Sequence, residues 1–335
     1  MLCFCPFMRS ASGIILPEPR TAILPLARTV CRLKSNHKKR TFMRRPDNQP
    51  LPPVEKLPAL SMGLRGCEAE QWLDGPDAFG DRAMRTRQLA EKQDLLSEQA
   101  SEVFVCLHDG KAAALEASQT IAAHLHHYHN MTISTEQAAC LRQISALIPE
   151  DVLVLTAPDN TAVEPDWVLT AASLCFPSHW RLSEKIGQSI TAIHTPVPEF
   201  ADTLARPVNR FFTTMQSGVL SQRLNWSVQT DDRLFAPTRP SPMEAIAHSA
   251  EEWGTIIHVR IERQCFYKLP ESGAVIFTIR TSLAPLSRFR QQPEFIKAVL
   301  KQASKLSSAF SAYKNIAEVE EGLRVWIDKH LPEPT

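Results

Sequence analysis

The stretch TIIHVRIERQCFYKLPESGAVIFTIRTSL, residues 255–283, contains two long runs of apolar and β-branched residues separated by a short turn. Runs in which apolar side chains alternate with polar ones are typical of half-buried β-strands. The connection PESG, residues 270–273, is too short for a crossover, so the two strands must pair as an antiparallel hairpin. The stretch therefore predicts an antiparallel sheet.

The rest of the chain predicts helices before, within and after this sheet. Alternation or short apolar runs predict strands at 151–157, 167–176 and 223–229. Asp81 and Thr135 are the expected N-caps of two of the early helices. Helices followed by two strands, short helices, three more strands and further helices indicate an α+β fold and not a parallel doubly wound one. Helical periodicity predicts the helices 81–99, 111–129, 135–148, 293–315 and 317–331.

The N-terminal region differs in charge from the rest of the chain. Residues 1–45 contain ten basic residues and one acidic residue, whereas the remainder is net acidic. A nucleic-acid-binding arm, an organelle transit peptide, or upstream sequence read in frame before Met43 would each have this composition. The last fits best, so residues 1–42 are expected to lie outside the fold. Residues 43–60 are expected to be an extended proline-rich leader, and residues 61–330 a single domain.

Composition narrows the class of protein. Hydrophobic residues make up 44% and charged residues 22%, as in ordinary globular proteins, and no apolar run approaches the ~20 residues of a membrane span. The eight cysteines form no CxxC pair, which favours buried, reduced thiols over disulfides or zinc and predicts a cytoplasmic protein. Phosphate-binding motifs of the types GxGxxG and GxxxxGK are absent, so this chain is not expected to bind a nucleotide cofactor itself.

The first candidate binding residue is Arg263. Alternation places it on the same strand face as Ile261 and Cys265, among apolar neighbours. A buried guanidinium requires an anion, because leaving it unpaired costs several kcal/mol. That anion is either an internal carboxylate or a bound one, such as a haem propionate. Arg223 and Arg280 raise the same question in their strands.

The second candidate is His194, in the passage CFPSHWRLSEKIGQSITAIHTPVP, residues 175–198. Ser189 can cap a brief helical turn, and Pro196 should end that turn just after His194. An imidazole in this position is either a buried histidine bonded to a carbonyl or an axial ligand of iron. His179, which precedes a tryptophan in a more polar setting, is the runner-up as a ligand.

The run HLHHYHN, residues 124–130, resembles a metal site at first sight. On a helix His124 and His127 share one side, as do His126 and His129. No carboxylate or cysteine completes either pair, so packing or solvent-facing histidines are predicted, with a non-haem metal site as the alternative.

Three blocks of the sequence resemble the haem-dependent oxidative N-demethylase alpha-subunit-like family. They are CFPSHWRLSEKIGQSITAIHTPVPEF, RPVNRFFTTMQSGVLSQRLNWSV and HVRIERQCFYKLPESGAVIFTIRTSLAPL, and they occur in the family's order. With the leader piece MGLRGCEAEQWL, the resemblance covers about residues 57–330. The family's motifs fall on His194, Asn225, Trp226, Arg260, Glu262, Arg263 and Gln264.

The resemblance implies a PAS-like domain that binds haem b through His194, with Arg263, Arg223 and Arg280 as candidate partners of the propionates. It implies oxidation of a small amine, similar to dimethylamine, by O2. Electrons would come from NADPH through a reductase subunit with FMN and a [2Fe–2S] cluster. A further subunit would bind tetrahydrofolate and take the formaldehyde unit. The alternative is a PAS-like sensor that binds haem or a small ligand without turnover.

Overall fold

The computed structural model describes residues 62–74, 82–158, 165–239, 248–304, 307–313, 316 and 319–331. All of them belong to one compact unit, Lys38–Thr335. The other unit, Met1–His37, lies outside the described residues, as do the expected boundaries at 42 and 60 and the expected cap Asp81. No described helix is both long and apolar enough to pass through a lipid bilayer.

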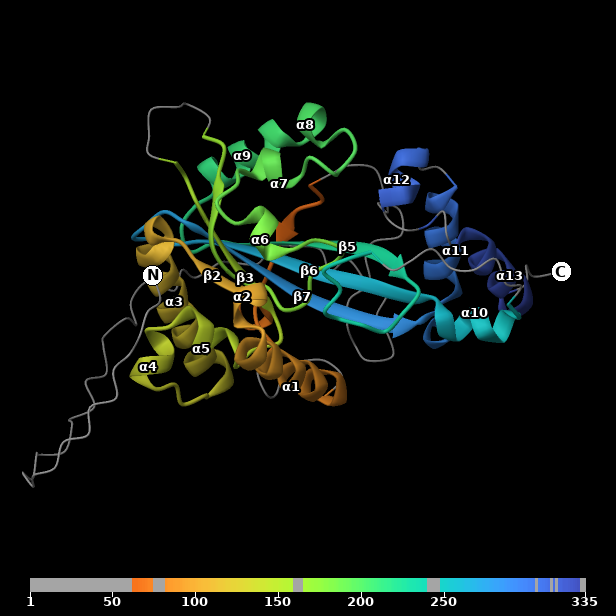
Figure 1. Ribbon diagram of the computed structural model, residues 1–335, viewed down its shortest axis with the longest axis horizontal. Helices are drawn as coiled ribbons and strands as arrows, with labels where there is room; N and C mark the ends of the chain where they lie inside the picture. Colours follow the sequence, from red (N-terminus) through yellow and green to blue (C-terminus); the bar gives the residue numbers. More distant parts are fainter. Residues whose placement is uncertain are drawn as a thin grey trace, which may run out of the picture. The chain divides into compact units, whose positions relative to one another are not determined.

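Within the described residues, the unit is built on a seven-stranded antiparallel sheet (Figure 1). Its strand order is β1-β5-β6-β7-β3-β4-β2. The predicted hairpin is confirmed, because β6 and β7 pair along their whole length and lie at the middle of the sheet. The strands are β1 Arg65–Gly66, β2 Phe104–Cys106, β3 Asp151–Thr156, β4 Val168–Ser173, β5 Leu220–Gln229, β6 His258–Lys268 and β7 Val275–Pro285.

Helices cover both faces of the sheet, which confirms the α+β class (Figure 1). Three short 3₁₀ helices lie at Ala69–Gln71, His108–Gly110 and Leu286–Phe289. The α-helices are α1 Arg82–Glu98, α2 Ala100–Val103, α3 Lys111–His129, α4 Thr135–Ala138, α5 Leu141–Ser145, α6 Leu182–Lys185, α7 Ile190–Ile193, α8 Phe200–Thr203, α9 Ala205–Thr214, α10 Ala250–Ile256, α11 Pro293–Ala303, α12 Ser308–Tyr313 and α13 Glu320–His330.

Three expectations need correction. The helix predicted at 135–148 is two short helices, α4 and α5, because the backbone is extended at Cys140. The cap of α4 is Ser134 and not Thr135, since the Ser134 hydroxyl accepts a hydrogen bond from the backbone N–H of Gln137. The helix predicted at 293–315 is likewise divided, into α11 and α12. The edge strands β1 and β2 were not predicted, because two or three residues carry no detectable alternation.

The pleat of β6 gives the sheet two chemically different faces. The first, called here the Arg263 face, also carries Ile261 and Cys265; the second, called the Glu262 face, also carries Gln264 and Phe266. Helices α3 and α5 pack at one end of the Arg263 face, and α10, α11 and α13 pack at the other. Helices α6 to α9 pack on the Glu262 face against Phe266 and β3, β4 and β7.

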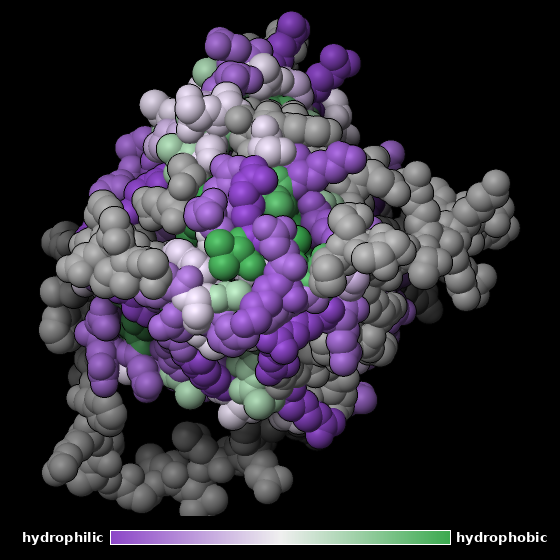
Figure 2. All heavy atoms as spheres, turned by 90° about the vertical axis from the view of Figure 1, so that its right-hand side faces the viewer, coloured by the Kyte–Doolittle hydropathy of each residue, from purple (hydrophilic) through white to green (hydrophobic). Residues whose placement is uncertain are grey.

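The C-terminal helices cross at two glycines. A Cβ atom on Gly254 of α10 would lie 2.7 Å from the indole nitrogen of Trp326, and one on Gly322 of α13 would meet the indole ring of Trp253. At the position of its glycine, each helix therefore leaves room for the tryptophan ring of the other helix. Trp326 is fully buried, whereas the outer surface of this end is mostly hydrophilic with a few hydrophobic side chains between (Figure 2).

Replacing Gly254 with valine should destabilise the fold by ~1–3 kcal/mol, because the buried Trp326 ring has no room to move aside. Chemical unfolding of the purified variant measures this loss. Gly66→Val is the matched control, since a Cβ atom at Gly66 meets nothing within 4 Å. Equal stability of the two variants would contradict this account of the helix crossing.

Candidate functional site

The short helical turn that carries His194 forms as the sequence predicts. Ser189 caps α7, because its hydroxyl accepts a hydrogen bond from the Ala192 N–H at 3.3 Å. His194 is the residue at which α7 ends, and its carbonyl accepts a hydrogen bond from the Val197 N–H at 2.8 Å. The ammonium of Lys185 donates to the Ile193 carbonyl at 3.0 Å, which stabilises the negative end of the short helix. The ring is thus carried on a closed turn.

The ring of His194 is held in one orientation. Its Nδ1 atom lies 2.8 Å from the carbonyl oxygen of Ile190, and the ring stacks on Phe200 with a centroid distance of 4.2 Å. A carbonyl only accepts, so Nδ1 carries the hydrogen and Nε2 keeps its lone pair. This is the arrangement in which protein imidazoles bind metals, with one nitrogen bonded to a carbonyl and the other to the metal.

The surroundings keep His194 neutral. Burial lowers the pKa of the half-buried ring, the bond to Ile190 opposes this, and the charges of Arg223 and Lys185 lower the pKa further. The neutral imidazole is the form that coordinates a metal ion.

Arg223 projects from the Glu262 face, because it pairs with Gln264 across β5 and β6. Its Nε atom is buried and has no hydrogen-bond partner among the described residues. Burial lowers the pKa of Arg223, and the nearby groups of Glu262 and Tyr313 raise it. A buried guanidinium N–H without an acceptor is costly, so the site favours an added anion.

Glu262 is the fixed negative charge of this face. Its carboxylate accepts hydrogen bonds from Arg260 at 2.9 Å, Gln264 at 2.9 Å and Asn225 at 3.3 Å. Burial would raise the pKa of Glu262, but the charge of Arg260 and these hydrogen bonds bring it below its ordinary value. The Nη1 atom of Arg260 is a second buried guanidinium nitrogen with no partner among the described residues. Together, these residues carry more positive than negative charge.

Arg263 and Arg280 do not join this group. They lie opposite each other on the Arg263 face, away from His194. Arg263 binds Asp74 at 3.1 Å and Glu150 at 3.3 Å, and Arg280 binds Asp74 at 2.5 Å. Of the two anions that the sequence allowed, an internal carboxylate is therefore the partner of both arginines, and Asp74 is shared between them. The structure does not bring Arg263 and Arg280 together with Arg223, because Arg223 faces Gln264 and consecutive residues of β6 point to opposite faces.

Comparison with known families identifies the chain. Residues 127–324 match the family described as "Haem-dependent oxidative N-demethylase, alpha subunit-like", which is more than half of the sequence. The chain belongs to this family. The matched residues include the whole of the His194 turn, Arg223 and Glu262, so the site described above lies within the part that defines this N-demethylase-like family.

His179 lies near the same polar group in this N-demethylase-like chain. Its backbone adopts φ 60°, a left-handed conformation that is uncommon outside glycine, and its N–H donates to the Ala236 carbonyl at 2.7 Å. Burial, followed by the charges of Arg239 and Arg260, lowers the pKa of His179 to about 4. The imidazole is therefore neutral near pH 7, although its strained backbone differs from the regular turn that carries His194.

The histidines of α3 lie in different surroundings. Among the described residues, no three His, Cys, Asp or Glu side chains are grouped so that they could hold a metal ion. His124 is buried and packs edge-on against Trp72 at a centroid distance of 5.0 Å, whereas His126 and His127 are exposed. His124 Nε2 has no hydrogen-bond partner within the described part of the chain, and burial lowers the pKa of His124 to about 3.

The sequence did not predict the carboxylates that pair with the arginines, or the contact that Arg239 makes with α12. Asp74 follows a short 3₁₀ helix, and Glu150 precedes β3. Arg239, in the segment after β5, donates a hydrogen bond to the Tyr313 carbonyl at the end of α12, at 3.4 Å. No local pattern marks such residues. In the sequence, the only sign of these carboxylates was that arginines lie on apolar strand faces and so require anions elsewhere in the fold.

Replacing His124 with phenylalanine should weaken the pH dependence of stability in acid. The folded chain does not protonate His124 until about pH 3, whereas the unfolded chain does so near ~6.5. The stability contributed by the neutral ring is therefore present above pH ~6.5 and is lost as the pH falls towards 3, by up to about 1.4 kcal/mol per pH unit.

Urea unfolding at several pH values measures this slope. His127→Phe, at an exposed position of the same helix, is the control. If both variants keep the slope of the unmodified chain, the buried state assigned to His124 is incorrect.

Proposed function

We propose that this chain is the haem-binding, oxygen-activating subunit of an oxidative N-demethylase, with His194 as the iron ligand. The observation that carries the proposal is the state of the His194 ring, whose Nδ1 is fixed on the Ile190 carbonyl while Nε2 keeps its lone pair. Membership of a family described as haem-dependent supports the choice of haem b over another metal group.

The residues on the Glu262 face fit such a cofactor. His194 offers a neutral nitrogen, and Arg223 offers a buried guanidinium N–H that lacks an acceptor among the described residues. A propionate would provide that acceptor and balance the excess positive charge. Arg223 is therefore the proposed propionate partner, whereas Arg263 and Arg280 already have theirs. The sheet and helices would form the PAS-like haem-binding fold expected from the resemblance.

Bound haem would supply the redox centre for the reaction of O2 with an N-methyl group. For dimethylamine, the amine, O2, two electrons and two protons would yield methylamine, formaldehyde and water. The chain's own residues would hold the cofactor through His194 and Arg223, and Glu262 would keep a fixed negative charge beside it.

The electrons would have to come from outside this chain, in which no nucleotide-binding motif is evident. We propose a reductase partner with FMN and a [2Fe–2S] cluster that uses NADPH, and a further subunit that binds tetrahydrofolate. The family description, "alpha subunit-like", supports the presence of partner subunits.

Removing the His194 ring should abolish normal haem binding. In His194→Ala, haem affinity should fall by more than about 100-fold, because even the hydrogen-bond partners of metal ligands contribute 10–100-fold. Optical titration of the purified chain with haem measures this through the Soret band. Added imidazole should restore the band in the variant, and His127→Ala should behave like the unmodified chain. An identical spectrum for His194→Ala would exclude His194 as the ligand.

Turnover distinguishes the demethylase from the sensor alternative. With haem, NADPH and a flavin-dependent ferredoxin reductase system, the chain should consume O2 when dimethylamine is added and release formaldehyde. His194→Ala should lose this amine-dependent uptake. A haem-loaded chain that binds O2, and is reduced by the donor, but forms no formaldehyde from small N-methylamines would support the sensor instead.

A further inference from the structure

Polar side chains form a strip across the Glu262 face. The register of β5 and β6 places six of them side by side, called here the polar strip: Arg223 and Gln264, Asn225 and Glu262, Ser227 and Arg260. At one end of the strip lies the apolar cluster that contains Phe266, and at the other lies the cluster that contains Phe176 and Leu283. A few polar groups between apolar walls are typical of a small-molecule site.

Arg260 is the buried end of the polar strip. Its side chain is only 1% exposed. Its Nε atom donates to the Glu262 carboxylate at 2.9 Å, and Nη2 donates to the Phe176 carbonyl and to the Thr281 hydroxyl. Nη1 is also buried, but it has no hydrogen-bond partner among the described residues. Because a buried N–H group without an acceptor is costly, this atom favours a ligand that brings an acceptor.

The polar strip is not sealed from solvent. Ser227 and Leu283, which lie opposite Arg260 on β5 and β7, are only half-buried. Asn225 and Gln264 are half-buried as well. A small molecule can therefore reach the strip without separating the strands of the sheet.

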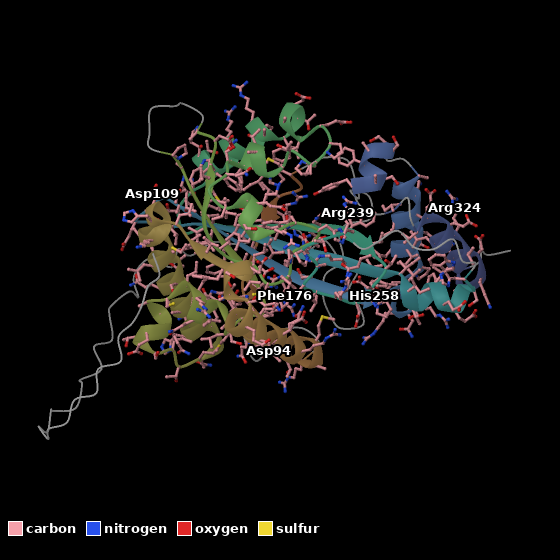
Figure 3. The ribbon with its side chains drawn as sticks, viewed as in Figure 1. Asp94, Asp109, Phe176, Arg239, His258 and Arg324 are labelled. Carbon is pink, nitrogen blue, oxygen red and sulfur yellow. The ribbon has the colours of Figure 1, made fainter. Side chains whose placement is uncertain are left out.

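The segment that Arg260 holds has a strained backbone. Arg260 binds it at the Phe176 carbonyl, and Figure 3 shows Phe176 against the central strands. Three residues later, His179 has φ 60°, and its N–H donates to the Ala236 carbonyl at 2.7 Å. Strained residues of this kind are concentrated at ligand and catalytic sites. The strain is a second indication, independent of Nη1, that this end of the strip binds a ligand.

The charges of the polar strip favour a ligand that carries both signs. Once a propionate neutralises Arg223, the remaining pair of Arg260 and Glu262 is neutral as a whole. The Glu262 carboxylate is oriented by Asn225 and Gln264 and is suited to a cationic amine, whereas Arg260 Nη1 is suited to a carboxylate. A simple ammonium ion would add an unbalanced positive charge and leave Nη1 without an acceptor.

We propose that the substrate is a short N-methyl amino acid, whose carboxylate accepts a hydrogen bond from Arg260 Nη1 and whose amine lies at Glu262. This inference rests on the proposed function and names the class of amine that is demethylated. N-methylglycine, O2, two protons and two electrons from the reductase partner would give glycine, formaldehyde and water. The methyl carbon loses two electrons as its C–N bond breaks, the partner supplies two more, and O2 accepts all four.

A comparison of two ligands on the unmodified, haem-loaded chain tests the carboxylate site. N-methylglycine should bind at least about tenfold more tightly than N-methylglycinamide, which has nearly the same shape but no negative charge. Isothermal titration calorimetry measures both affinities. Dimethylamine, which has no carboxylate, should bind as weakly as the amide. With NADPH and the reductase system, N-methylglycine should yield glycine and formaldehyde.

A substitution tests whether Arg260 is responsible. Arg260→Lys keeps the positive charge but removes Nη1, so it should abolish the preference for the acid over the amide. Arg324→Lys, at an exposed position of α13, is the matched control and should keep this preference. Because Arg260 also holds Phe176, its variant risks misfolding. The comparison of ligands needs no variant and decides the proposal in that case.

The outcomes separate this inference from the proposed function. Equal affinity for the acid and the amide would overturn the carboxylate site and leave the demethylation of simple amines standing. If acetate and N-methylglycine bind the haem-free chain but are displaced by haem, Arg260 binds a propionate and the substrate class is wrong. If the chain prefers the acid but develops no Soret band with haem, the proposed function fails and the carboxylate site stands.

Discussion

The alternation of side chains along β6 is the constraint on which the rest of the structure depends. This strand pairs with β7 along all its eleven residues and with β5 from His258 to Tyr267, so its register determines which charges face each layer of helices. Glu262 and Arg263 are neighbours in sequence, but they belong to two separate networks. Because a slip of one residue would exchange the faces, the register must be strongly specified.

The two networks differ in the kind of buried atom that is left without a hydrogen-bond partner among the described residues. On the Arg263 face, two arginines share Asp74 and one of them also binds Glu150, so the charges are balanced mainly within the chain. On the Glu262 face, two guanidinium nitrogens remain buried without a partner among the described residues. Such groups are rare in folded proteins because they are costly. In the Arg263 network the atom without a partner among the described residues is a carboxylate oxygen, Glu150 Oε2, so the two networks differ in the sign of the charge that is left over.

The sequence predicted the elements with strong local signals. The hairpin of β6 and β7, the cap at Ser189 and the end of the turn at His194 follow from alternation, a hydroxyl and a proline, and all three are confirmed. The partners of the arginines could not be predicted in the same way. Asp74 and Arg280 are 206 residues apart, and only the folded sheet brings them together. The resemblance indicated the family, but it did not show which arginines lie on the Glu262 face, against which the helix before His194 packs.

The ion pairs of Asp74 also determine which parts of the chain can be removed. Asp74 lies before α1 and outside the residues that define the family match, yet its carboxylate neutralises two arginines of the central strands. A shortened polypeptide that began at the family boundary would leave both guanidinium groups without this counter-charge in the interior. Such a fragment is therefore expected to be less stable than the longer chain, and a stable version should extend upstream far enough to include Asp74.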